Sequence, residues 1–277
     1  MPTTLVHILL AIATLSSGAH QDGAETEAQR VRSLLDRMAK AHASVEVFVS
    51  PLTYRKEYGL EGDFETRIGA VSMKGEGAGR EMALVFDRII DVSGHGTDQA
   101  EFHMFKDGWW TEVDPRQKRF IRRQIVEPGS STDPFQLGEG PLPLPLNQDP
   151  ETVLTRFEVS IGSVPDEPLF RWITEAEVLH LVPRPGTPAF EDHESIDLLF
   201  EKSTLLPVGI RLSHRNGDRT TAWLREPSAQ AKDAFLDQAR LEEFETLLAE
   251  ARPENGWTIE SKALPAPKPP RQELEQE

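Results

Sequence analysis

Hydrophobic residues recur along this chain at two spacings, one typical of helices and one typical of strands. Between Val31 and Ala41 the apolar residues lie three or four positions apart, with charged residues between them. This spacing predicts an amphipathic helix over residues 25–42. From residue 44 to residue 50 every second residue is apolar, so a half-buried strand is expected there.

Further alternating stretches follow, and glycine-rich turns separate them. The stretch from Glu101 to Val126 predicts three short strands, because Asp107-Gly108 and Asp114-Pro115 are typical turn pairs. Asn216-Gly217 predicts a second hairpin. The other strands are expected at 53–58, 64–73, 80–92, 177–183, 194–200, 208–214 and 219–224.

The three strands of residues 101–126 should form an antiparallel meander. Trp109 and Val113 point to one side of the middle strand, and Trp110 points to the other. We expect one apolar face and one solvated face. Only one of the two tryptophans can then enter the core, and either could serve packing alone.

A proline-rich segment interrupts the strands between Pro128 and Pro150. In it Leu142, Leu144 and Leu146 alternate with prolines, so the segment should be extended and outside the sheet. It should either cross the mouth of the sheet, with its leucines facing an apolar interior, or pack as a loop on the outside.

Helical spacing returns near the end of the segment and again near the end of the chain. Asp149-Pro150 is a typical helix start, and a short helix is expected to about Phe157. A second helix is expected at 229–252 and a last strand at 256–259. The order of elements predicts a mainly β (α+β) fold, with a curved antiparallel sheet around a helical cover.

The ends of the chain differ from this central part. Residues 5–15 are mostly apolar and precede Ser17-Gly18-Ala19, a pattern typical of a secretory signal peptide cleaved after residue 19. The alternative is a buried N-terminal helix, since no Lys or Arg precedes the apolar run. We therefore expect a signal peptide at 1–19, one domain at 20–262 and a disordered proline- and charge-rich tail at 263–277.

Charge and composition exclude several classes of function. The net charge is −16, which argues against nucleic acid as a partner. The chain has no Cys, so disulfides, thiol chemistry and a lipid anchor on cysteine are excluded. Five basic residues between Arg116 and Arg123 nevertheless form a cluster, which is either a docking surface for an acidic partner or lipid headgroups, or a solvated strand face.

Catalytic and metal-binding signatures are missing. There is no G-x-S-x-G elbow and no H-E-x-x-H helix, and the glycine run at 75–79 lacks the Lys-Ser/Thr of a phosphate loop. His95, Asp98 and His103 have unspecific spacing, and the run 192–194 reads as an exposed loop end. We expect no enzyme, no metal and no cofactor.

Several of these stretches together resemble the LolA-like family of periplasmic lipoprotein carriers. They are the Asp107-Gly108-Trp109 hairpin, the Pro-Leu segment leading into Asp149–Val159, the strands around Leu179–Pro183 and Asn216-Gly217, and the stretch Gly256–Ile259. The resemblance covers residues 25–262. It implies an open half-barrel with a helical lid.

The resemblance also implies a function. A LolA-like protein would be a soluble, monomeric periplasmic binding protein or chaperone that holds acyl chains of lipoproteins or lipids for transfer toward the outer membrane. Its partners would be an inner-membrane release complex or an outer-membrane acceptor. The alternative is an envelope-stress regulator of the same fold, which senses lipoproteins and contacts a membrane-bound partner.

Site residues follow from both arguments. The acyl cavity and lid are expected at Trp109, Trp110, Leu142, Leu144 and Leu146. The family carries a switch Arg after a Gly-x-x-x-x-Lys stretch; here 69–74 fits the stretch, Gly75 replaces the Arg, and Arg80 is the nearest candidate. Docking of a partner or headgroup is expected at Arg80, Arg119, Arg122 and Arg123.

Overall fold

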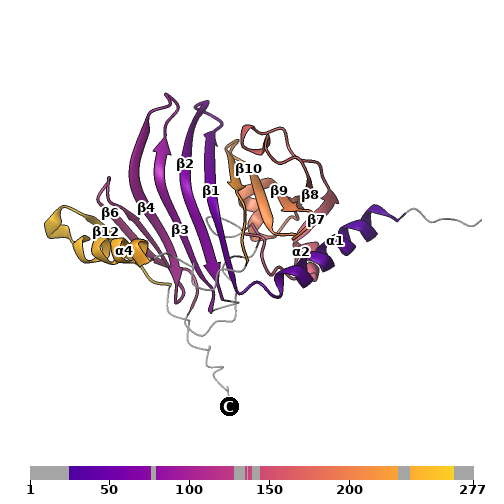
Figure 1. Ribbon diagram of the computed structural model, residues 1–277, viewed down its shortest axis with the longest axis horizontal. Coiled ribbons are helices and arrows are strands. Elements are labelled where there is room, and N and C mark those ends of the chain that lie inside the picture. Colours follow the sequence, from indigo (N-terminus) through magenta and orange to yellow (C-terminus); the bar gives the residue numbers. More distant parts are fainter. Residues whose placement is uncertain are drawn as a thin grey trace, which may run out of the picture.

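The computed structural model describes residues 25–75, 79–127, 135, 137–138, 144–229 and 238–264. Most of these residues form one large curved sheet with helices at its two ends (Figure 1). The helices within the described residues are α1 (Glu27–His42), α2 (Pro150–Arg156), α3 (Pro188–Asp192) and α4 (Gln238–Glu250). Two short 3-10 helices add to them, η2 (Pro168–Phe170) and η3 (Pro253–Asn255).

The strands fall into two groups along the chain, one before and one after the proline-rich segment. The first group is β1 (Val47–Tyr58), β2 (Asp63–Lys74), β3 (Glu81–Ile90), β4 (Gly96–Lys106), β5 (Trp109–Asp114) and β6 (Arg119–Gln124). The second group is β7 (Phe157–Ile161), β8 (Ala176–Pro183), β9 (His193–Glu201), β10 (Pro207–His214), β11 (Arg219–Leu224) and β12 (Thr258–Lys262).

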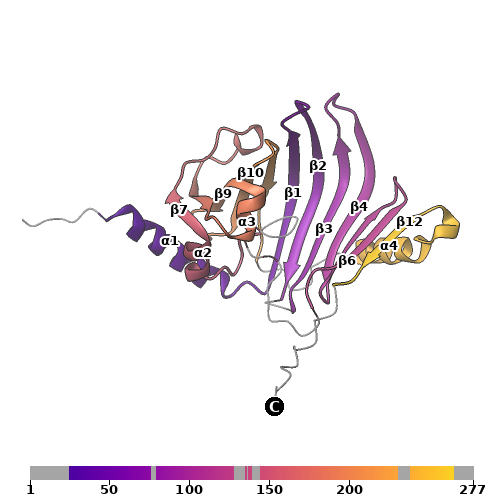
Figure 2. The same ribbon diagram turned by 180° about the vertical axis from the view of Figure 1, so that it is seen from behind.

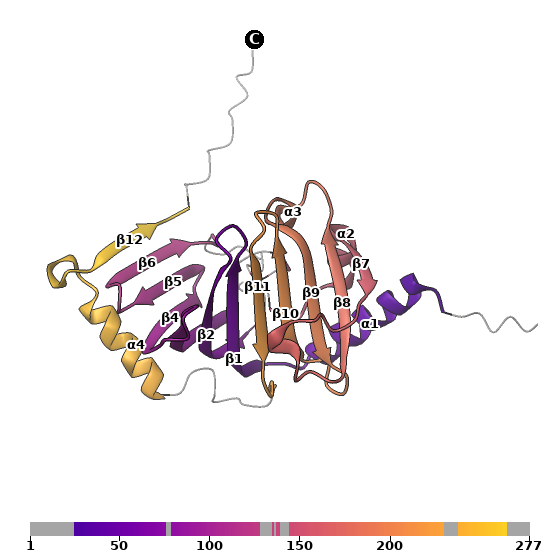
Figure 3. The ribbon, with the colours of Figure 1, turned by 90° about the horizontal axis from the view of Figure 1, so that it is seen from above.

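These strands of the described residues pair into one open sheet in the order β12-β6-β5-β4-β3-β2-β1-β11-β10-β9-β8-β7. Figure 3 shows them side by side in this order. The first group and β7–β11 are each an antiparallel meander, and the pairing of β1 with β11 joins the two. The last strand, β12, is parallel to β6. The expected mainly β fold with a curved open sheet is confirmed, with this parallel pair as a difference.

Two local features shape the long strands near this junction. The sequence pattern separated residues 44–50 from 53–58 at Pro51, yet β1 runs through that proline. Proline is tolerated there because the ladder with β11 ends at the Leu52–Leu224 pair, so its missing N–H interrupts no pair on that side. At Gly69 the β2–β3 register shifts, and a Cβ atom would lie 1.9 Å from the carbonyl oxygen of Val85. Glycine therefore permits this bulge.

One face of the sheet carries the main hydrophobic core, and we call it the inner face. Its side chains alternate along the strands with those of the opposite, outer face. Helix α1 packs onto the inner face near β7 through four apolar residues and His42. Figure 2 shows α2 and α3 beside β7, β9 and β10 at this same end of the sheet. The apolar residues of α1 are Val31, Leu34, Leu35 and Met38.

The outer face is also covered, at two places. Phe244 and Leu247 of α4 pack with Phe102, Val113 and the buried Trp257 over β3–β5. Farther along the sheet, Phe170 of η2 covers Val178 and Leu199. The expectation that the meander of residues 101–126 has one solvated face is therefore wrong. The alternation was read correctly, but a helix distant in sequence covers the second face.

The proline-rich segment contributes to the core. Leu144 and Leu146 are fully buried in the main cluster, together with Phe135 and Leu137. The side chain of Gln148 ties these parts together, since it accepts a hydrogen bond from the Leu137 N–H and donates to the carbonyl oxygens of Phe135 and Leu146, at 3.2–3.3 Å. Leu144 and Leu146 thus face the apolar interior, whereas a lid across the mouth of the sheet stays a prediction. Leu142 lies outside the described residues.

Other expectations concern the ends of the chain. The signal peptide at 1–19 and most of the tail at 263–277 lie outside the described residues. Among the helices that the structure describes, each is too short or too polar to cross a membrane. Helix α2 begins at Pro150 with Asp149 as its N-cap, as expected, because the Asp149 carboxylate accepts a hydrogen bond from the Thr152 N–H at 2.8 Å.

The first testable consequence concerns Leu146. If its segment is core, Leu146→Ala leaves a cavity and lowers the free energy of unfolding by about 2–5 kcal/mol. Leu60→Ala is the control, because Leu60 is 92% exposed in the β1–β2 turn and its change should stay within about 0.5 kcal/mol. Urea denaturation followed by circular dichroism measures both. Equal stabilities of the two variants would contradict a structural role for the segment.

The second consequence concerns pH. His42 is 1% exposed, and its Nε2 lies 2.8 Å from the carbonyl oxygen of Leu205. Burial lowers the pKa of His42 and outweighs this hydrogen bond, which raises it. The unfolded chain therefore takes up a proton at higher pH than the folded one, starting at about pH 6.5. The free energy of unfolding should fall as the pH drops from about 7 to about 5.

The matched variants for this experiment are His42→Gln and His95→Gln. His95 lies in an exposed turn, so its replacement should leave the pH dependence of the wild type in place. His42→Gln should make the dependence shallower, although His193 and His214, whose pKa values burial also lowers, retain part of it. Urea midpoints at neutral and mildly acidic pH decide the question. An unchanged slope in His42→Gln would show that His42 does not contribute.

Candidate functional site

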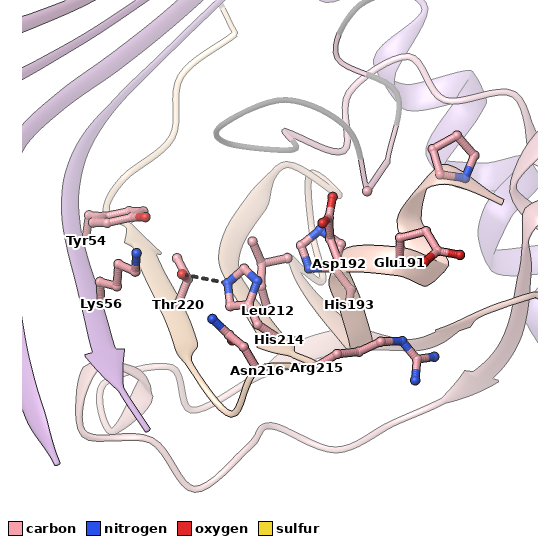
Figure 4. A pocket seen from close by; sticks show the side chains of 12 residues that line it. Tyr54, Lys56, Glu191, Asp192, His193, Leu212, His214, Arg215, Asn216 and Thr220 are labelled. Carbon is pink, nitrogen blue, oxygen red and sulfur yellow. Dashed lines mark hydrogen bonds between the residues drawn. The ribbon is translucent and has the colours of Figure 1, made fainter. Parts of the chain in front are cut away.

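Two adjoining cavities lie on the inner face where the two meanders meet. The larger has a volume of about 570 Å³ and the smaller about 230 Å³. Tyr54 and Lys56 of β1 line both cavities, so the two lie side by side, and we call them together the trough. A cavity of several hundred Å³ is typical of small-molecule sites. This trough is the candidate functional site, and Figure 4 shows its larger cavity.

The strand register places the lining residues. In the sheet Lys56 pairs with Glu65 of β2 on one side and with Thr220 of β11 on the other. Directly paired residues point to the same face, so all three line the trough. Tyr54 pairs with Arg67 in the same way. Residues far apart in sequence, such as Lys56 and Thr220, thereby share one surface.

The smaller cavity contains a network of charged side chains above Leu84 and Phe86. Arg67 pairs with Glu65 at 2.6 Å and with Glu101 at 2.9 Å, and His103 Nε2 lies 2.9 Å from Glu101 Oε1. Burial alone would raise the pKa of the Glu101 carboxyl, but His103 and Arg67 together lower it. Glu101 is therefore ionised at neutral pH. Its charge is balanced by the neighbouring side chains Arg67 and His103, so this end of the trough needs no ligand to compensate it.

The larger cavity contains a pair of histidines, His193 of β9 and His214 of β10. Their ring centroids are 5.0 Å apart, and His214 Nε2 lies 3.0 Å from the Thr220 hydroxyl. Burial lowers the pKa of both imidazoles, so both are neutral at pH 7. His193 is only 7% exposed, and its Nδ1 has no hydrogen-bond partner within the described residues. A buried nitrogen in this state costs free energy unless a ligand or water satisfies it.

Among the described residues no three His, Asp or Glu side chains gather in a way that could hold a metal ion. His95, one of the three residues with metal-like spacing in the sequence, bonds to Ser93 in the turn before β4, whereas His103 faces the trough. The polar groups of the trough are suited to bind and orient a ligand.

Of the residues expected at the acyl site, the four that the structure describes, Trp109, Trp110, Leu144 and Leu146, do not line the trough. Trp110 is buried in the main core, and its Nε1 donates to Glu112 at 3.0 Å. Trp109 lies on the other face of β5, with the Arg122 guanidinium 4.4 Å from its ring. Leu144 and Leu146 lie in the core between the helices and the sheet. That these residues contact a ligand stays a prediction.

The docking arginines do not form one surface. Arg80 is 1% exposed, so its assignment to an exposed docking surface is wrong. Arg119 and Arg123 point to the inner face, and Arg122 points to the outer face, because they alternate along β6. Arg123 is also 3.3 Å from Glu112. The cluster that the sequence suggested is therefore divided between the two faces of the sheet.

Sequence reasoning missed the residues that do line the trough. Part of the signal was present in the sequence. Every second residue of β1 faces the core, and in its second half these residues are polar or aromatic: Tyr54, Lys56 and Tyr58 follow Leu52. A row of such residues on the core-facing side of a strand indicates a solvent-filled cavity or a ligand site. His193 was noted only within the run 192–194, as an exposed loop end. Its burial depends on β10, which no local pattern reveals.

Comparison with known proteins gives similarity to solved structures only. No family model and no curated protein matches the chain. The structure of the Pseudomonas aeruginosa MucA/MucB complex matches over 76% of this chain and 62% of that chain, with 16% identity and a TM-score of 0.39. This chain thus spans less than two thirds of that one. A conserved protein from Thermus thermophilus matches over 77% of this chain and 93% of its own, with 11% identity and a TM-score of 0.40.

A third similar structure is a LolA superfamily protein from Nitrosomonas europaea. It matches over 72% of this chain and 92% of its own, with 11% identity and a TM-score of 0.29. At these values the similarity concerns the sheet architecture alone, so function has to be argued from the trough itself.

Proposed function

We propose that this protein is a periplasmic binding protein that holds an acyl-bearing amphiphile, a lipoprotein or a lipid, on the inner face of its sheet. The observation that carries the proposal is the trough of about 570 and 230 Å³, which combines apolar walls with polar groups. Leu84, Phe86 and Leu212 provide apolar wall, whereas Lys56 and the two histidines provide polar contacts. An amphiphile needs both kinds of surface.

The cover of the inner face supports the same conclusion. Among the described residues, helices and Leu144 and Leu146 of the Pro-Leu segment cover the core beside the trough, and no second sheet lies there. Such a cover can shift without breaking any strand ladder, because the packing of Leu144 and Leu146 and the hydrogen bonds of Gln148 hold it. Acyl chains could then take the places of these leucines. Each methylene buried in this way contributes about 0.8 kcal/mol.

No catalytic step is required by this function. Binding of acyl chains by hydrophobic burial is tight and reversible, as a carrier needs. Export to the periplasm rests on the apolar run before residue 19 and is part of the proposal.

Filling the trough tests the proposal. Leu212→Trp places a larger ring at the wall of the larger cavity, and Leu84→Trp does so in the smaller one. Dansyl-undecanoic acid, a fluorescent acyl probe, should bind the wild type and bind either variant about tenfold more weakly. Exclusion of two methylenes is enough for this loss, at about 0.8 kcal/mol each.

Val182→Trp is the matched control, because Val182 is exposed on the outer face of β8 and lines neither cavity. Circular dichroism shows whether each variant is folded, and native mass spectrometry of wild type purified from its own envelope identifies any retained lipid. Equal probe affinity in all folded variants would refute binding in the trough. A protein without acyl ligand that captures the periplasmic segment of an inner-membrane protein would instead match the envelope-stress regulator.

A further inference from the structure

The charged groups of the larger cavity are separated by sign. Lys56 lies on the β1 side, whereas Glu191 and Asp192 lie at the end of α3, with His214 and His193 between them (Figure 4). A cavity with opposite charges at its two sides is complementary to a ligand that carries both charges.

These three charged side chains have no partner of opposite charge in the described structure. Within the described part of the chain, Lys56, Glu191 and Asp192 form no ion pair; the Lys56 ammonium rests 4.8 Å from the centroid of the Tyr58 ring. Arg215 also lines the cavity, but its guanidinium stacks 4.0 Å from the Phe190 ring and its Nε donates to the Phe190 carbonyl oxygen. In Figure 4 it points away from the histidines.

The buried His193 supplies an independent indication of a ligand. Its Nδ1 is enclosed and has no partner within the described residues, and the residue lines the cavity. Both histidines are neutral at pH 7 because burial lowers their pKa values. They can therefore donate or accept hydrogen bonds beside Lys56 without adding charge.

We propose that the larger cavity binds a phosphoethanolamine headgroup, with its phosphate at Lys56, His214 and His193 and its ammonium at Asp192 and Glu191. Lysine is a usual phosphate ligand as a point charge. Carboxylates accept the hydrogen bonds of a primary ammonium, which a quaternary ammonium cannot donate. This inference rests on the proposed function, because it names the headgroup of the amphiphile that the trough holds.

Binding of four probes to the whole protein tests the inference. The probes are lysophosphatidylethanolamine, lysophosphatidylglycerol and lysophosphatidylcholine with the same acyl chain, and free phosphoethanolamine. Isothermal titration should give the ethanolamine lipid at least about tenfold higher affinity than the other two lipids, since charged hydrogen bonds of this kind are lost with them. Free phosphoethanolamine should bind far more weakly, because it lacks the acyl chain. Equal affinity of the free compound and the lipid would assign the cavity to a soluble phosphoamine and overturn the lipid inference.

Variants separate the two ends of the headgroup. Glu191→Gln with Asp192→Asn should weaken binding of the ethanolamine lipid about tenfold but should not weaken that of the glycerol lipid, because the anionic glycerol headgroup makes no ammonium contact with these carboxylates. Lys56→Gln should weaken binding of both lipids, because both carry the phosphate. The controls are Glu158→Gln and Lys202→Gln, exposed residues that do not line the cavity and should change neither affinity.

The outcomes distinguish this inference from the proposed function. If dansyl-undecanoic acid binds but the three lysolipids bind equally and the variants have no effect, the headgroup inference is wrong and acyl binding stands. If neither the acyl probe nor any lysolipid binds, both are wrong. The inference holds only if the ethanolamine preference is present in the wild type and disappears in the Glu191→Gln, Asp192→Asn variant.

Discussion

The pairing of β1 with β11 is the constraint on which the rest of this structure depends. It joins two meanders that are separated in sequence by the proline-rich segment, and residue pairs from Leu52–Leu224 to Glu57–Arg219 make the junction. Closing so long a loop costs conformational entropy, which only the combined ladder and core can offset. Once it is closed, the inner faces of both meanders become one surface. The trough lies across this junction, with Lys56 on one strand and Thr220 on the other.

The inner face has an apolar, close-packed part and a polar part that borders the cavities. Toward α1 and the Pro-Leu segment the side chains are apolar and close-packed, which supplies most of the hydrophobic stabilisation. At the junction the same face carries ionisable groups, and these are handled in two ways. Glu101 is satisfied by Arg67 and His103, so its burial is compensated. His193 Nδ1 is buried without a partner in the described structure, which costs free energy unless water or a ligand satisfies it.

The outer face shows how the sheet supports the trough from behind. The Glu167 carboxylate, 2% exposed, lies 2.8 Å from Arg219 and 3.4 Å from Arg211, and Arg211 reaches Asp197 at 2.6 Å. This network links β9, β10 and β11 on the face opposite to the two histidines. Removal of one member of a buried ion pair usually costs about 3–5 kcal/mol, and less where the partner is partly exposed, as these arginines are. The strands that carry the histidines are therefore held in fixed positions, as pre-organised binding requires.

Local sequence determined the elements of this protein, and tertiary structure decided the site. Period-two alternation, the Asp107-Gly108 turn and the Asp149-Pro150 helix start predicted strands, a hairpin and α2 correctly, because each depends on neighbouring residues alone. The burial of Val113 under α4 and of Leu146 in the main core could not be read locally, because the covering residues are far away in the chain. The trough likewise needs Lys56 beside Thr220, and only the register of β1 against β11 brings those two side chains together. Alternation fixes which residues share a face of one strand, whereas long-range pairing fixes which strands share that face.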